Sequence, residues 1–160
     1  MKLRSRLEKL EAPALVRWRE AWQHYLMTVG PYVDALNEPL IAVYDEAQKL
    51  GILETTADSR NALDALTHRL GLPTWITSWS WGDTEVPDDE HPNLKLWPHT
   101  LPSPPPEPPG AWEQLEPFTR SEDVVERWCA YICLFTLGHA RGHREYAQRP
   151  HSIGKSADTP

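Results

Sequence analysis

The stretch VVERWCAYICLFTL (residues 124–137) decides the fold. Its side chains are apolar nearly all round a helix, which is typical of a helix buried at the centre of a protein. Ser121 is the expected N-cap, and Glu122 and Asp123 suit the positive end of the helix dipole. We expect this central helix to continue to about Gln148.

Four earlier segments also show the apolar spacing of helices. The predicted helices cover residues 2–11, 14–29, 31–50 and 58–70. Pro13 suits the first turn of the second helix, while Gly30 ends that helix and Pro31 begins the next. Pro39 either kinks the third helix or restarts it near Asn37. The chain is therefore expected to be all-α, a bundle of four to five helices.

The segment 72–120 breaks this helical pattern. Residues 82–117 hold ten of the sixteen prolines, and their run LPSPPPEPPG favours polyproline II. The stretch TWITSWSWG (residues 74–82) fits either a short strand or a helical turn. We predict a single helical domain over residues 1–148, in which 72–120 is an irregular acidic insertion, and a disordered tail over residues 149–160.

Charge and cysteine content narrow the class of protein. The formal net charge is −7 and the sequence pI is about 5.5, which argues against nucleic-acid binding. Cys129 and Cys133 lie four residues apart and are poorly placed to bond each other, so we expect free thiols in a reducing compartment. The first residues have no apolar core of a signal peptide, and no run reaches the length of a membrane span. These features predict a cytoplasmic protein.

Eight tryptophans are the most unusual feature of the composition. Trp18, Trp22 and Trp128 fit helical stripes and are expected in the core. The other five lie in or beside the irregular insertion: Trp75, Trp79, Trp81, Trp97 and Trp112. These five either anchor a protein partner or hold the insertion on the bundle, with each indole N–H finding a hydrogen-bond acceptor. The first alternative predicts a small adaptor or accessory protein without a cofactor, whose acidic residues steer a basic partner.

Two histidines near the end of the chain suggest another kind of site. His139 and His143 lie four residues apart and continue the core-facing stripe of the last helix. They are either hydrogen-bonded side chains at the core edge, acid–base groups, or ligands of a divalent transition metal. A catalytic metal site needs a third protein ligand, and spacing alone places none, because His24 and His68 point away from the apolar stripes of their helices.

The sequence HARGHR (residues 139–144) is similar to the closing H-x-x-x-H-R of the DinB/YfiT-like four-helix proteins. The resemblance implies a metal site completed by a third histidine from an earlier helix, and His68 falls in a plausible order for it. It also implies thiol- or water-dependent transfer chemistry. A metal-dependent enzyme of this type, using His139 and His143, is therefore the alternative functional prediction.

Overall fold

A computed structural model of the chain describes residues 2–79 and 94–149, with the side chains of residues 2–12 left aside. The described residues contain helices and no strand, so the all-α prediction is confirmed for them. The helices are α1 (Lys2–Lys49), α2 (Thr56–Leu70), α3 (Trp75–Ser78), α4 (Ala111–Leu115) and α5 (Val124–Gln148), with 3₁₀ turns η1 (Pro98–Thr100) and η2 (Glu116–Arg120). None of the described helices is long and apolar enough to cross a membrane.

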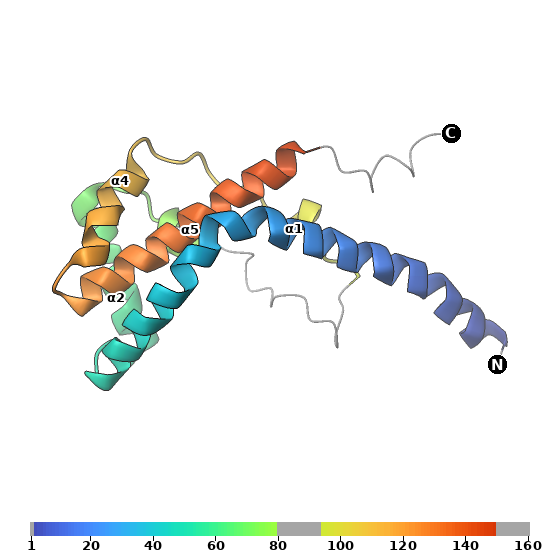
Figure 1. The fold of residues 1–160 in the computed structure, drawn as a ribbon, viewed down its shortest axis with the longest axis horizontal. Helices are drawn as coiled ribbons and strands as arrows, with labels where there is room; N and C mark the ends of the chain where they lie inside the picture. Colours follow the sequence, from blue (N-terminus) through green and yellow to red (C-terminus); the bar gives the residue numbers. More distant parts are fainter. Residues whose placement is uncertain (1, 80–93, 150–160) are drawn as a thin grey trace.

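α1 is one continuous helix where the sequence predicted three. Pro13, Pro31 and Pro39 all lie inside it, so the predicted separation at Pro13 and at Gly30 was wrong. An internal proline removes a backbone hydrogen bond and costs about 3 kcal/mol. Packing offsets this cost, because one face stays buried along most of the helix: Trp18, Trp22, Tyr25, Val29, Val33, Val43 and Ala47. Figure 1 shows α1 bending about midway along its length, as prolines commonly cause.

α5 is the central helix, as predicted, and it contacts α1, α2, α3 and α4. It runs in the opposite direction to α1 (Figure 1). Its N-cap is Asp123 rather than the predicted Ser121, because Oδ1 of Asp123 accepts the backbone N–H of Val125 at 2.8 Å. Ser121 instead donates its hydroxyl proton to Glu126 at 2.7 Å. The helix ends at Gln148, where the sequence placed its end.

Two glycines of α5 allow α1 to approach closely. A Cβ atom on Gly138 would lie 2.6 Å from the carbonyl oxygen of Tyr32, and one on Gly142 would lie 2.7 Å from Cα of Val29. Both distances are shorter than any ordinary contact between such atoms, so only glycine fits at either position. Gly138 directly precedes His139, and Gly142 directly precedes His143. The two helices therefore approach each other closely at the part of α5 that carries these histidines.

Hydrogen bonds and an ion pair hold the proline-rich part of the insertion against α5. The guanidinium of Arg141 donates to the carboxylate of Glu107 through Nε at 2.8 Å and through Nη2, and it lies 4.7 Å from the centre of the Trp112 ring. Arg144 donates to the carbonyl oxygen of Pro105. These contacts hold the proline-rich chain along the helix.

The aromatic stretch before this segment is helical where it is described. α3 covers Trp75–Ser78, which confirms the helical-turn alternative for those residues. Residues 80–93, which include Trp81, and residues 150–160 of the predicted tail lie outside the described residues.

Candidate functional site

The two histidines of α5 meet a tyrosine of α1. Oη of Tyr25 lies 3.1 Å from Nε2 of His139 and 3.2 Å from Nδ1 of His143. Tyr25 is fully buried, His143 is 3% exposed, and His139 is half-buried. A tyrosine hydroxyl carries one proton, so it donates to one imidazole and accepts the N–H of the other. Both hydrogen bonds therefore form when the two imidazoles adopt complementary tautomers.

Burial keeps both imidazoles neutral near pH 7. Burial, followed by the nearby His143, lowers the pKa of His139 to about 4. Burial and then Arg144 lower the pKa of His143. A neutral imidazole has a free lone pair that can accept a proton or bind a metal ion. The three side chains can therefore relay a proton through Oη of Tyr25 or hold a cation.

Of the four predicted partner-binding tryptophans that the structure describes, Trp79 packs against this pair. Its ring centre lies 5.8 Å from that of His139 and 5.7 Å from that of His143. Nε1 of Trp79 is buried and has no hydrogen-bond partner in the described part of the chain. A buried donor left unpaired costs about 1–3 kcal/mol, so this N–H is a strong potential donor to a bound molecule.

The donors that could hold a metal ion are the two imidazole nitrogens and Oη of Tyr25. Among the described residues, no group of three or more His, Cys, Asp or Glu side chains is placed to bind a metal. His68, which the family resemblance implies as a third ligand, is exposed on α2 and lines a separate hollow beside Asp64 and Thr74. A metal bound here by His139 and His143 would take Tyr25, and not His68, as a protein ligand.

The other three predicted partner-binding tryptophans that the structure describes pack against the helical body. Trp75 and Trp112 are half-buried against the apolar cluster that includes Leu115 and Leu137, and Trp97 is half-buried against the cluster that includes Trp18. Nε1 of Trp97 donates to the carbonyl oxygen of Leu94 at 2.8 Å. Packing thus gives each of these three a role in holding the insertion. Partner binding stays a prediction for all five tryptophans, of which Trp81 lies outside the described residues.

The tryptophans predicted for the core lie there. Trp18, Trp22 and Trp128 are all buried. The Nε1 atoms of Trp18 and Trp22 both donate to the carbonyl oxygen of Leu96, at 2.9 and 3.1 Å. The buried face of α1 therefore also holds the chain at Leu96, near the start of the described range 94–149.

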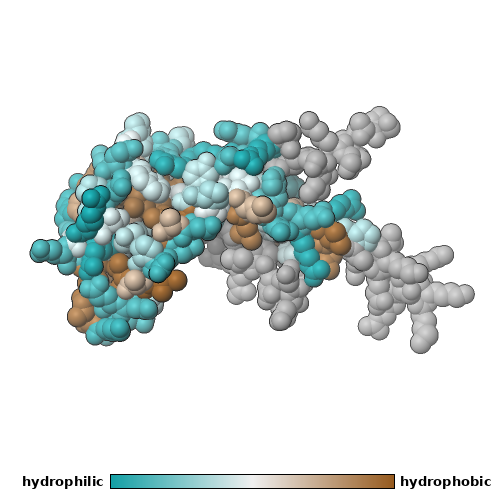
Figure 2. Space-filling model, in the orientation of Figure 1, coloured by the Kyte–Doolittle hydropathy of each residue, from teal (hydrophilic) through white to brown (hydrophobic). Residues whose placement is uncertain are grey.

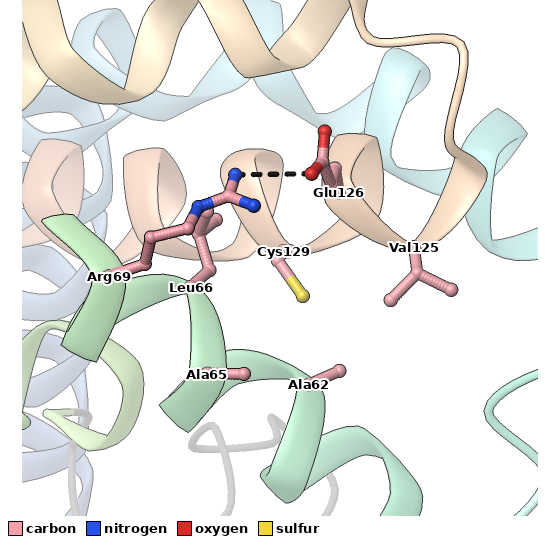
Figure 3. A pocket seen from close by; sticks show the side chains of 7 residues that line it. All are labelled: Ala62, Ala65, Leu66, Arg69, Val125, Glu126 and Cys129. Carbon is pink, nitrogen blue, oxygen red and sulfur yellow. Dashed lines mark hydrogen bonds and ion pairs between the residues drawn. The ribbon is translucent and has the colours of Figure 1, made fainter.

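A groove of about 240 Å³ lies between α2 and the first turns of α5 (Figure 3). Its apolar walls are Ala62, Ala65 and Leu66 of α2 and Val125 and Cys129 of α5. Arg69 and Glu126 line it as well and form an ion pair of 3.1 Å. Burial raises the pKa of the Cys129 thiol to about 12, so this thiol stays protonated and acts as an apolar wall atom.

Exposed apolar side chains also occur on α1, and Figure 2 shows brown surface in several places. The large ones are Val16, Leu26, Met27, Ile41 and Tyr44, and Leu50 directly follows the helix. They are spread along the length of the helix, and scattered exposed apolar residues are ordinary on a protein surface. The groove is the more specific feature, because it is concave and its apolar walls come from two helices.

Sequence reasoning found the histidines but missed Tyr25 and the two glycines. The repeat G-H-x-x-G-H (residues 138–143) is a signal that could have predicted the close contact with α1. It places two glycines on one face of a helix and two histidines on the adjacent face. Tyr25 itself fitted a core stripe, and its buried hydroxyl required a hydrogen-bond partner.

Comparison with known proteins gives no family for this chain: no family model, no curated protein and no solved structure matches it. Its function is therefore inferred from its own residues.

Proposed function

We propose that the chain is a small helical adaptor or accessory protein that binds a basic segment of a partner protein in the groove between α2 and α5. The groove is the observation that carries this proposal. Its volume of about 240 Å³ and its apolar walls suit one large apolar side chain of a partner. Apolar anchors seated in such pockets supply most of the energy of many protein interfaces.

The walls of the groove are held in place by the protein core. Leu66 is 5% exposed and Cys129 is 1% exposed, so both extend from the buried interior to the groove floor. Ala65 is exposed on the same face of α2. A groove formed on two packed helices needs little ordering when a partner binds, which favours affinity.

Charge favours a basic partner. The chain carries a formal net charge of −7. The two segments that form the groove, residues 56–70 and 121–129, contain five acidic and three basic side chains. Acidic charge speeds the approach of a basic partner and makes the association weaken as salt rises.

The tryptophans of the insertion remain the alternative docking surface. We favour the groove because the described part of the insertion is engaged by α5 through Arg141 and Arg144. We also propose a cytoplasmic location, because Cys129 and Cys133 are free buried thiols that suit a reducing compartment.

A peptide-display selection tests the proposal with a matched pair of variants. A random peptide library is selected on the wild-type chain alone, and the affinity of the selected peptides is then measured for Ala65→Phe, which places a phenyl ring in the groove. Ala57→Phe makes the same change at an exposed position of α2 outside the groove and serves as the control.

We expect the selected peptides to combine one large apolar residue with neighbouring Lys or Arg. Their affinity should fall at least tenfold for Ala65→Phe and stay within about twofold for Ala57→Phe, where tenfold corresponds to about 1.4 kcal/mol. Peptides that bind both variants equally well, or that are acidic, would contradict the proposal.

A further inference from the structure

We propose that Nε2 of His139, Nδ1 of His143 and Oη of Tyr25 bind one divalent transition-metal ion. This site lies between α1 and α5 and does not depend on the groove or on the adaptor function. It differs from the site implied by the family resemblance, because its third ligand is a tyrosine of α1 and not a histidine.

The distances from Oη of Tyr25 to the two imidazole nitrogens fit a metal site. Oη of Tyr25 lies 3.1 and 3.2 Å from the two imidazole nitrogens. In a tetrahedral site with metal–ligand bonds of about 2.0 Å, neighbouring ligand atoms lie about 3.3 Å apart. The ion could therefore take the place of the two hydrogen-bonding protons with little movement of either helix.

The chemistry of the three donors favours a first-row ion. Two neutral imidazoles and a phenolate form an N₂O set, which suits Zn²⁺ or Cu²⁺, with Cu²⁺ bound more tightly. Binding converts the phenol of Tyr25 to phenolate, and its proton leaves to solvent. The imidazole that donates its N–H to Oη changes tautomer, so that its proton moves to the other ring nitrogen and a lone pair faces the ion. The negative phenolate offsets one of the two positive charges of the ion, which reduces the cost of placing it in a buried site.

Trp79 supplies an independent indication of a bound group. Its indole packs on both imidazoles, and its buried Nε1 has no hydrogen-bond partner among the described residues. A tetrahedral ion with three protein ligands takes water or an anion in the fourth position. The N–H of Trp79 can donate to the oxygen of that fourth ligand.

The close packing of α1 and α5 holds the three donors together. Gly138 and Gly142 fix the distance between α1 and α5, because any larger side chain would strike the backbone of α1. The donors are thus brought together before the ion binds. Preorganised donors of this kind hold a metal more tightly than ligands on mobile loops.

The test is titration of the full-length, tag-free chain with Zn²⁺ by calorimetry and with Cu²⁺ by absorption spectroscopy. The variants are Tyr25→Phe and His143→Gln. His24→Gln serves as the control, because His24 is the neighbour of Tyr25 in α1 and is exposed. Far-UV circular dichroism checks that each variant is folded.

We expect one equivalent of Zn²⁺ to bind to the wild-type chain and to His24→Gln, and at least tenfold weaker binding to Tyr25→Phe and His143→Gln. With Cu²⁺, the wild-type chain should show a phenolate-to-copper charge-transfer band that Tyr25→Phe lacks. Undiminished Zn²⁺ affinity in Tyr25→Phe would overturn the proposal. If the variants fail to fold, the absence of the charge-transfer band in copper-loaded wild-type chain would overturn it instead.

Discussion

Substitution of Gly142 by alanine tests the contact that places α1 against the histidines. The new Cβ would lie 2.7 Å from Cα of Val29. Carbon atoms in ordinary contact are about 3.5–4.0 Å apart, so α1 must move away by about 1 Å. The same movement stretches both hydrogen bonds of Tyr25.

The size of the effect follows from three contributions. Overpacking of a well-packed interface costs about 1–3 kcal/mol. Loss of the two hydrogen bonds of Tyr25 costs about 1 kcal/mol each. The higher helix propensity of alanine offsets about 1 kcal/mol of this loss of stability. The expected net destabilisation of Gly142→Ala is about 2–4 kcal/mol.

Urea unfolding followed by tryptophan fluorescence measures this loss directly, and thermal unfolding should show a melting temperature lowered by roughly 4–16 °C. The control is Ala147→Gly, at an exposed position near the end of α5. It changes helix propensity without a close contact and should cost about 1 kcal/mol or less. If Gly142→Ala is as stable as the wild-type chain or more stable, the close approach of the two helices is wrong.

Three further predictions concern pH, the insertion and the cysteines. Because the folded-state pKa of His139, about 4, lies below its ordinary value of 6.5, the unfolded chain takes up the proton first; His139 should therefore lower the stability by as much as about 3 kcal/mol between pH 6.5 and pH 4. Urea unfolding at both pH values should show that His139→Phe removes this part of the loss, while the part from the lowered pKa of His143 stays. Glu107→Gln should destabilise the chain by up to about 1 kcal/mol, because its ion pair is partly exposed; the same change at exposed Glu116 should have no measurable effect, and equal effects would rule out a fastening role for Glu107. Burial raises the pKa of Cys129 and of Cys133 to about 12, so a thiol reagent should label them only after urea unfolding, and rapid labelling of the folded chain would refute their burial.

The long helices could be predicted from the sequence because their apolar spacing is local information. α5 and α2 appear within a few residues of their predicted ranges for this reason. The continuity of α1 could not be predicted in the same way. The cost of Pro31 and Pro39 is visible locally, while the packing that offsets it comes from α5, about a hundred residues later in the chain.

The candidate sites also combine local features, which the sequence shows, with long-range contacts, which it does not. The pairing of His139 with His143 is visible in a single helical turn, but their contact with Tyr25 joins residues 114 and 118 positions apart. The groove depends on how α2 crosses the start of α5. Nothing in the sequence around Ala62 and Ala65 predicts that crossing. Tryptophans are conspicuous in a composition, whereas a hollow between small side chains appears only when two helices are seen together (Figure 3).

Amide hydrogen exchange of the full chain, with and without a peptide selected on the wild-type chain, tests most directly where a partner binds. We predict slower exchange on peptide binding in Thr56–Leu70 and in the first turns of α5, and unchanged exchange over residues 94–120. Protection confined to residues 94–120, with none in α2, would contradict the groove as the docking site and would favour the tryptophans of the insertion.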